Sequence, residues 1–522
     1  MKTIKSLILG SAAGLLAMGG AQAADLPVKA KAVEYVKICS LYGAGFFYIP
    51  GTDTCIKLGG YLRADVTFNG GVYGAPFWNG DGGQTNRYRD YFGARSRMQL
   101  TVDTRTATQY GVVRTFGLSN WQFQNNGTAN ATTLGTFPAS STTGLMGPGG
   151  GYVSVDLLFI QFAGFTFGRS ASAYSTPWHG YPGNNTSFLM GGNDSVTGVN
   201  NIQYQAQFGN GVSATIGLED PSVYDRTAVL NMAFVPTVAS NAAGVGAYGG
   251  THAPDIVGNV RVDQAWGLFQ ISGRAHEVVP SYNILTAGTG VPNNVSEISG
   301  HPDSKWGGSV MAALQIKNIP TGAGDDIKID ASYTKGAVKD VIATSAPSPS
   351  FVMFGGTGLA GAYQSIGFGQ TADATYLPVF AGGDGQLKLV DAWGVRGAFN
   401  HNWDPQWSTS LWGAYSAVRY SGTVGDLTTA KGQWCANYTT AAKAPSADYV
   451  CNPDFNVAQV GMVTRWTPVA NLTFSGEVGA IFLDQKMTGS MLLTPTAPKP
   501  VARYEFRDQS TVYLNFQARR NF

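Results

Sequence analysis

The sequence is poor in charged residues, in cysteine and in long apolar runs. Charged residues make up 13% of its 522 residues, whereas an ordinary soluble domain carries about 25%. After residue 23, no segment approaches the roughly 20 consecutive apolar residues that a membrane-spanning helix needs. These shortages exclude a helical membrane protein and make an ordinary soluble domain a poor fit.

The sequence also lacks the residue patterns of an enzyme, a metal site or a nucleic-acid-binding protein. None of the five histidines accompanies a serine and an acid in a recognisable nucleophile motif. Neither clustered histidines nor a CxxC spacing suggests a bound metal. The 34 basic residues, less the two before residue 23, leave 32 against 32 acidic residues. We therefore expect no catalysis, no cofactor, no metal and no nucleic-acid partner.

The amino terminus has the pattern of a cleaved export signal. Lys2 and Lys5 precede the apolar run from Leu7 to Met18, and Ala21-Gln22-Ala23 provides small residues on both sides of a cleavage motif. We predict a signal peptide at 1–23 and a mature chain at 24–522.

The four cysteines form two pairs with equal separation in the sequence. Export would bring them into an oxidising compartment. An oxidising compartment favours disulfides over metal ligation. We expect Cys39 to bond to Cys55, and Cys435 to bond to Cys451; free buried thiols are the alternative.

The last fourteen residues, from Gln509 to Phe522, alternate with period two between apolar and polar side chains. Val512, Leu514, Phe516, Ala518 and Phe522 share one parity. Such alternation predicts a strand with one apolar face. Ending on Phe522, it is typical of the strand that outer-membrane barrels present to lipid and to their assembly machinery. A half-buried strand of a soluble sandwich is the alternative for this segment alone.

Alternation of this kind recurs along the chain. A barrel wall made this way also explains a mean hydropathy near zero, because lipid-facing and lumen-facing residues cancel. An even number of strands with both chain ends at the periplasmic side is what a closed bacterial barrel requires. We interpret sixteen segments as strands, which predicts an all-β, antiparallel transmembrane barrel: 56–68, 90–104, 108–118, 152–162, 164–170, 199–208, 211–220, 254–266, 267–277, 305–317, 325–335, 388–402, 407–420, 454–466, 471–485 and 509–522.

Several blocks resemble the alphaproteobacterial general porins of the outer membrane, the rhizobial type of trimeric porin. They are KICSLYGAGFFYIPGTDTCIKLGGYLR before and at the first strand, FIQFAGFTFGRSAS at 159–172, QFGNG at 207–211, RVDQAWG at 261–267 and the closing FQARRNF. The resemblance implies a sixteen-stranded barrel, a homotrimer surrounded by outer-membrane lipid and lipopolysaccharide, and passive diffusion of small hydrophilic solutes. Residues 24–54 would form a periplasmic segment before the barrel. Loops 221–253 and 336–387 follow no pattern of the family.

The same resemblance implies that loop 171–198, after the fifth strand, folds into the barrel and narrows the channel. Its aromatic side chains would pack on the inner wall, and Asp194 is its only carboxylate. We expect the loop to cover the inside of strand 152–162 and a neighbouring subunit to cover its outside. An external disordered loop is the alternative. The four aromatic residues are Tyr174, Trp178, Tyr181 and Phe188.

Arginines on the inward parity of the first two strands, Arg63, Arg95 and Arg97, form a predicted basic ladder that faces this loop. Opposed charges across a constriction would create a transverse field that orients dipolar solutes. Alternatively, the arginines pair with acids across the strands, at Asp65 and Asp103. The candidate constriction residues are Tyr61, Arg63, Asp65, Arg95, Arg97, Arg114 and Asp194.

Three functions fit the sequence. A general diffusion porin fits best, a channel selective for a sugar or an anion comes second, and a structural or adhesive barrel with a closed lumen comes third. Bases only slightly outnumber acids at the inward positions, so we expect weak ion selectivity.

Overall fold

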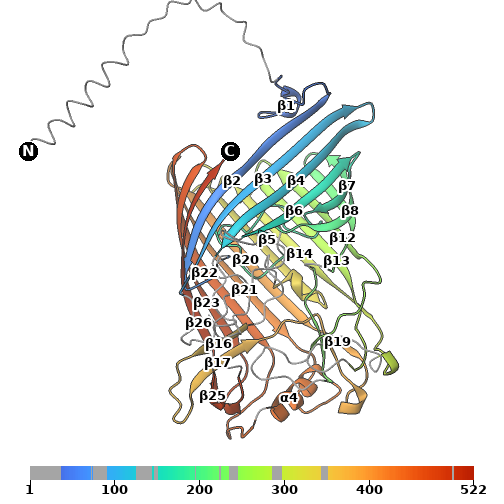
Figure 1. Cartoon of the computed structure of the whole chain (residues 1–522), viewed down its shortest axis with the longest axis vertical. Helices are drawn as coiled ribbons and strands as arrows, with labels where there is room; N and C mark the ends of the chain where they lie inside the picture. Colours follow the sequence, from blue (N-terminus) through green and yellow to red (C-terminus); the bar gives the residue numbers. More distant parts are fainter. Residues whose placement is uncertain are drawn as a thin grey trace, which may run out of the picture.

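A computed structural model gives the fold of most of the chain (Figure 1). The structure describes residues 37–71, 73, 91–124, 144–145, 151–193, 196–222, 225–233, 245–284, 297–342, 351–441, 443–495 and 499–522. The predicted signal peptide and Asp194 lie outside the described residues.

Sixteen antiparallel strands form a closed barrel, as the alternation predicted. Each strand pairs with its neighbour along the chain, and β26 pairs with β2 from Tyr61↔Asn521 to Phe68↔Leu514, which closes the ring. Two short strands, β1 (Phe47–Tyr48) and β5 (Gly144–Leu145), extend the same sheet. The barrel strands are β2 (Thr54–Phe68), β3 (Phe92–Thr108), β4 (Gly111–Gln124), β6 (Gly151–Phe162), β7 (Phe165–Ser170), β8 (Val199–Gly209), β9 (Val212–Glu219), β12 (Asp255–Gln264), β13 (Gly267–Val278), β14 (Lys305–Lys317), β15 (Asp326–Lys335), β20 (Asp391–Asn402), β21 (Trp407–Arg419), β22 (Phe455–Val469), β23 (Leu472–Gln485) and β26 (Gln509–Asn521).

Short turns lie at one end of the barrel and long loops at the other. The end with β1 and the carboxyl terminus carries the turns, as Figure 1 shows. One of them is Asn210-Gly211, between β8 and β9, where φ is +49° and +74°. Positive φ at two successive residues is what a primed hairpin turn requires, and Asn-Gly adopts it readily. Short turns at one end and long loops at the other are the arrangement of outer-membrane barrels, in which the turns are periplasmic.

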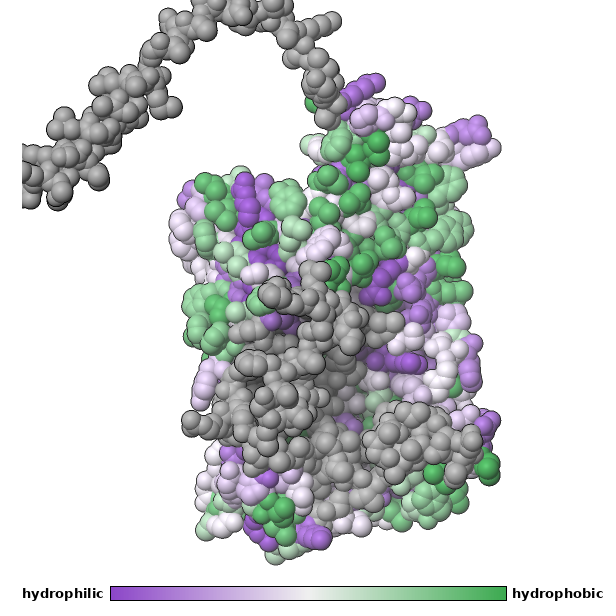
Figure 2. Space-filling model, in the orientation of Figure 1, coloured by the Kyte–Doolittle hydropathy of each residue, from purple (hydrophilic) through white to green (hydrophobic). Residues whose placement is uncertain are grey.

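Side chains alternate between the two faces of the wall. In β26, Val512, Leu514 and Phe516 are exposed on the outside, whereas Tyr513 and Asn515 are buried on the inside. Hydrophobic residues gather on the outer wall near the turn end (Figure 2). This is the distribution of a wall that meets lipid outside and water inside.

The long loops fold into a second layer beyond the barrel, at the lower end of Figure 1. We call this layer the cap. It contains two four-stranded sheets and a helix. The sequence pattern predicted no strand or helix in most of this region. The cap elements are β10 (Val229–Asn231), β11 (Val245–Gly246), η2 (Val338–Asp340), β16 (Phe351–Gly355), β17 (Gln364–Gly369), β18 (Ala374–Tyr376), η3 (Val379–Ala381), β19 (Leu387–Leu389), α4 (Ala430–Ala441), β24 (Ser490–Leu493) and β25 (Ala502–Phe506).

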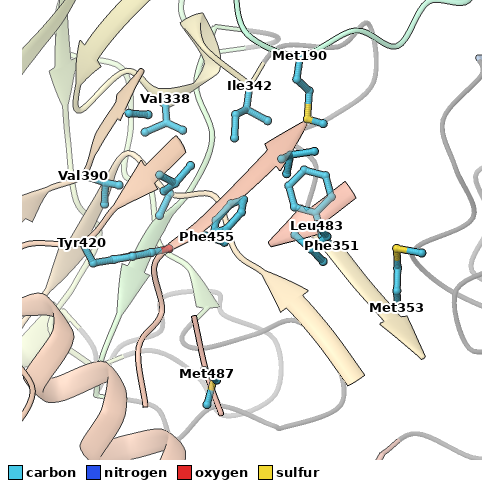
Figure 3. Packing of buried hydrophobic residues seen from close by; sticks show 14 of the residues in the cluster. Met190, Val338, Ile342, Phe351, Met353, Val390, Tyr420, Phe455, Leu483 and Met487 are labelled. Carbon is cyan, nitrogen blue, oxygen red and sulfur yellow. The ribbon is translucent and has the colours of Figure 1, made fainter. Parts of the chain in front are cut away.

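The largest hydrophobic cluster joins the cap to the barrel. Phe351 of β16 packs edge-on against Phe455, the first residue of β22, with ring centroids 5.6 Å apart. Trp434 of α4 stacks on Phe368 at 5.7 Å. Met190 of loop 171–198 belongs to the same cluster and lies near Ile342 in Figure 3. The cap is therefore a packed structure rather than a set of separate loops.

Both predicted disulfides are present. Cys39 bonds to Cys55 at the turn end, and Cys435 of α4 bonds to Cys451 in the cap. Free cysteines are absent from the part of the chain that the structure describes. The two bonds stabilise opposite ends of the molecule.

Replacing Cys435 and Cys451 by serine should loosen the cap and leave the barrel intact. A disulfide that closes a loop of this size contributes about 3 kcal/mol. We expect faster protease cleavage between residues 420 and 454, measured on intact protein in detergent, with unchanged heat resistance of the barrel. The Cys39→Ser, Cys55→Ser variant is the control, and equal cleavage at 420–454 in both variants would contradict this prediction.

Candidate functional site

Four arginines from three adjacent strands meet on the inner wall. Arg519 of β26 is the register partner of Arg63 in β2, and Arg63 is the partner of Arg97 in β3. Arg95 lies one inward position further along β3. We call these four residues the arginine cluster. Exposed fractions of 6%, 4% and 9% for Arg63, Arg95 and Arg97 show that three of them are almost completely covered.

Asp65 is the acid that pairs with this cluster. Arg95 donates to it through Nε and Nη2, with the shorter contact at 2.7 Å, and Nε of Arg63 lies 3.1 Å from its carboxylate. Arg97 donates instead to the side-chain oxygen of Gln122 at 2.5 Å. One carboxylate therefore serves two of the four cations.

Two tyrosine rings cover the arginine cluster. The guanidinium carbon of Arg519 lies 4.0 Å from the centre of the Tyr61 ring, and that of Arg63 lies 5.6 Å from it. Tyr73 approaches Arg95 at 5.0 Å. Aromatic faces attract cations, so these rings hold the guanidinium groups flat against the wall.

Arg114 does not join the cluster. It donates to Asp103 at 3.0 Å and to Gln161 at 2.8 Å, and Arg105 shares the same aspartate. The alternative pairing of the cluster arginines with acids across the strands occurs for Arg95, which bonds to Asp65 of β2. Asp103 pairs with Arg114 and Arg105 instead, so pairing with acids accounts for only part of the charge at the arginine cluster.

The start of loop 171–193 contacts the inner wall far from the arginine cluster. Near its start, Asn259 of β12 donates to the carbonyl of Ala173, and Gln270 of β13 donates to that of Ser175. Tyr174 and Trp178 pack with Val257, Met311 and Ala313 of β12 and β14. The aromatic residues at the start of the loop therefore contact the wall at β12–β14.

The rest of the loop continues along the wall towards β26. Arg465 of β22 donates to the carbonyl of Gly183 at 2.6 Å. Glu477 of β23 accepts from the backbone of Asn185 and from the hydroxyl of Thr186. Arg396 of β20 contacts the Tyr181 ring at 5.5 Å, and Phe188 is buried in the cluster shared with the cap.

This course differs from the predicted one in the strands that the loop covers. We expected the loop to cover the inside of strand 152–162, which is β6. The hydrogen bonds above place it on β12–β26 instead, and its end contacts β6 through the Gly198 amide and the Asp156 carbonyl. The inside of β6 carries Phe159, which stacks on Phe116 of β4 and contacts Arg114. Neighbouring side chains of the wall thus cover the apolar residue that the loop was expected to cover.

A buried group of acids anchors the start and the end of the loop to the wall. Arg274 of β13 forms ion pairs with Glu219, Asp225, Asp255 and Asp340 at 3.5, 3.2, 2.7 and 3.0 Å. We call this group the acidic anchor. Its carboxylates also hold the loop directly: Glu219 accepts from Ser172, and Asp340 accepts from Asn193 at 2.8 Å.

Burial affects the protonation of the cap residue in this anchor. Desolvation raises the pKa of Asp340 to about 6, against the attraction of Arg274, and the nearby Asp225 raises it further. The Asp340 carboxyl is therefore partly protonated in the mildly acidic range.

The sequence analysis missed Arg519 and Arg274 as parts of these two groups. Arg519 has the inward parity of the last strand, and closure of the barrel necessarily places that strand beside the first. The place of Arg519 beside Arg63 could therefore have been predicted from the sequence. The acids around Arg274 come from two barrel strands and two long loops, and no spacing in the sequence connects them.

Comparison with known proteins gives a consistent result. A family model described as the porin subfamily matches residues 25–515. The porin Omp2b of Brucella neotomae is 29% identical over 384 residues, covering 68% of this chain and 93% of that protein. The porin Omp2b of Brucella suis biovar 1 is 33% identical over 275 residues, covering 51% and 63%.

A solved structure shares the fold at low sequence identity. The outer membrane channel DcaP of Acinetobacter baumannii superposes with a TM-score of 0.54 at 13% identity, covering 91% of this chain and 99% of that one. This likeness concerns the fold alone.

The acidic anchor should loosen as pH rises. A carboxyl whose pKa is raised on folding, from 3.8 to about 6 for Asp340, contributes stability below pH 4 that is lost as pH passes 6. The Gly191 amide donates at 2.8 Å to the carbonyl of Val341, the residue after Asp340. Its hydrogen exchange, corrected for its intrinsic rate, should therefore show less protection at pH 7 than at pH 4.5. Asp340→Asn should flatten this dependence, and Asp391→Asn, at the start of β20, should not. An Asp340→Asn protein that keeps the full dependence would exclude Asp340 as its source.

Proposed function

Because the chain belongs to the porin subfamily, we propose that its arginine cluster and loop 171–193 together line the narrowest part of the channel. The protein is a general porin of the outer membrane, and not an enzyme. The proposal adds which residues of this porin a permeating solute contacts.

The order of strands around the barrel supports this assignment. β3, which carries Arg95 and Arg97, is the second of the sixteen barrel strands, and β14, beneath Tyr174, is the tenth. Strands eight positions apart in a ring of sixteen lie on opposite sides. The start of the loop, at Tyr174, and the arginine cluster therefore approach the lumen from opposite walls, and this single observation carries the proposal. Later residues of the loop reach β23 and β26, beside the cluster.

The charges on the two sides of the channel are the second part of the proposal. The cluster has four cations against Asp65, and Asp194 of the loop is proposed to face it. A field between the two sides would orient dipolar solutes and disfavour apolar ones. Small hydrophilic solutes would then diffuse passively, without a cofactor and without a tightly bound substrate.

A channel with a preference for anions is the second candidate. The observation that favours it is the excess of cations at the narrow part, where one carboxylate is shared by Arg63 and Arg95. A structural or adhesive barrel has less support, although the folded cap would suit such a role.

We infer a homotrimer as the assembled form. The family resemblance supports it, and so does a patch on the outside of the barrel. Leu158 and Ile160 of β6 and Phe165 and Phe167 of β7 are all exposed there. A neighbouring subunit would cover this patch, and outer-membrane lipid and lipopolysaccharide would cover the remaining wall.

Phe522 is proposed as the signal read by the barrel-assembly machinery. Its side chain is exposed, and its backbone exchanges hydrogen bonds with Gly60 at 3.1 and 3.2 Å. The residue is therefore held beside the seam between β26 and β2 with its ring accessible.

Purified protein added to planar bilayers should form open, weakly selective channels. Each insertion should raise the conductance by three equal units. The steps follow from a trimer with one pore in each subunit. Verified insertion without conductance would contradict the porin, and single steps would contradict the trimer. Saturation by one sugar at low concentration would favour a selective channel.

Reversal potentials in dilute salt should reveal the proposed constriction charges. Asp194→Lys should raise the permeability of anions relative to cations, and the triple variant Arg63→Ser, Arg95→Ser, Arg97→Ser should lower it. A charge about 4 to 8 Å from a passing ion contributes on the order of 0.5 to 1 kcal/mol, which changes the ratio several-fold. The effect should fade at 1 M salt, where the Debye length is about 3 Å. Unchanged potentials in both variants would place these residues outside the narrow part.

A further inference from the structure

The arginine cluster contains buried hydrogen-bond donors that have no acceptor among the residues that the structure describes. They are Nη2 of Arg63 and Nη1 of Arg95. Both side chains are more than nine-tenths buried. A buried donor that belongs to a charged group and has no acceptor is costly, and each such group in a native structure calls for an explanation.

The positions of the arginines also indicate a shortage of negative charge beside them. Arg519, Arg63 and Arg97 are successive partners in one row across three strands, and side chains directly opposite in a sheet have Cβ atoms about 4.5 to 5.5 Å apart. Like charges at this spacing destabilise the sheet. Asp65 serves Arg63 and Arg95, whereas Arg519 bonds to the neutral Asn521. Among the described residues, Asp65 is thus the acid shared by Arg63 and Arg95, while Arg519 has a neutral partner.

We propose that the arginine cluster is a binding site for an oxyanion, a phosphate or carboxylate group, carried by a solute in the channel. This inference rests on the proposed function in so far as the cluster must be reached from the lumen. The bound group would accept hydrogen bonds from Nη2 of Arg63 and Nη1 of Arg95, and its charge would offset the row of three cations.

The chemistry of the donors favours an oxyanion over a halide. A guanidinium group presents its N–H donors in a planar fork that matches two oxygens of a carboxylate or phosphate. Asp65 already occupies one edge of the Arg95 fork, and the site offers one further N–H group from each of two adjacent strands, Nη2 of Arg63 and Nη1 of Arg95, which two oxygens of one group can accept. The rings of Tyr61 and Tyr73 lie over these guanidinium groups. Chloride has no pair of oxygens to match the forks and gains the charge attraction alone.

Inorganic phosphate is the probe for the test. Single-channel chloride current through the wild-type protein should fall along a saturable curve as phosphate is added. Arg63→Gln and Arg63→Lys should each weaken the apparent phosphate affinity about tenfold or more, because the loss of one charged hydrogen bond has an effect of that order.

Arg114→Gln is the matched control. It removes one cation from the same inner wall, but Arg114 is already paired with Asp103 and Gln161. Its phosphate affinity should equal that of the wild type. Heat resistance of the assembled protein, measured for each variant, would show that the barrel has folded.

The outcomes separate the oxyanion site from the proposed constriction. A current that falls without saturation, or an equal loss of affinity in Arg63→Gln and Arg114→Gln, would overturn the site. If reversal potentials still shift in the triple arginine variant, the constriction stands without the site. Acetate in place of phosphate distinguishes the two ligand groups: saturation by acetate assigns the site to carboxylates as well, and saturation by phosphate alone restricts it to phosphates.

Discussion

The pairing of the first barrel strand with the last is the constraint on which the rest of the structure depends. Backbone groups inside a bilayer have no water to bond with, so a sheet there must leave no free edge. The bonds between β2 and β26 meet this requirement across a separation of about the whole chain. The same seam brings Arg519 beside Arg63 and sets Phe522 against Gly60. The arginine cluster thus exists because the ring is closed.

Sequence alone predicted the barrel well because lipid and lumen impose opposite demands on successive residues. All sixteen predicted segments correspond to strands, and the two disulfides follow from local spacing together with export. The boundaries differed mainly for β3 and β4, whose predicted segments ended at 104 and 118 and which extend to Thr108 and Gln124. Most of those extra residues, such as Gln122 and Arg105, are polar and weaken the apolar signal.

The cap could not be predicted from local pattern, because its contacts are distant in sequence. Phe351 packs on Phe455, and β17 pairs in parallel with β25, more than 130 residues away. The candidate site was predicted in part for a similar reason. Parity placed Arg63, Arg95 and Arg97 on one face, but the partner of each depends on register, which the sequence does not state. Parity alone therefore could not predict that Arg114 would pair with Asp103, or that Arg97 would bond to the neutral Gln122.

The packed cap has a consequence for how the cell surface is recognised from outside. Antibodies and bacteriophages that meet a porin contact its external loops first. Here those loops form one structure around Trp434 and the Cys435–Cys451 bond, so neighbouring surface residues come from segments far apart in the chain. A receptor-binding protein must then recognise a shape, and a short synthetic peptide copied from one loop would present few of its features. Variation that evades such recognition is confined to exposed positions such as Phe380 and Val424, because changes beneath them would disturb the core that holds the surface together.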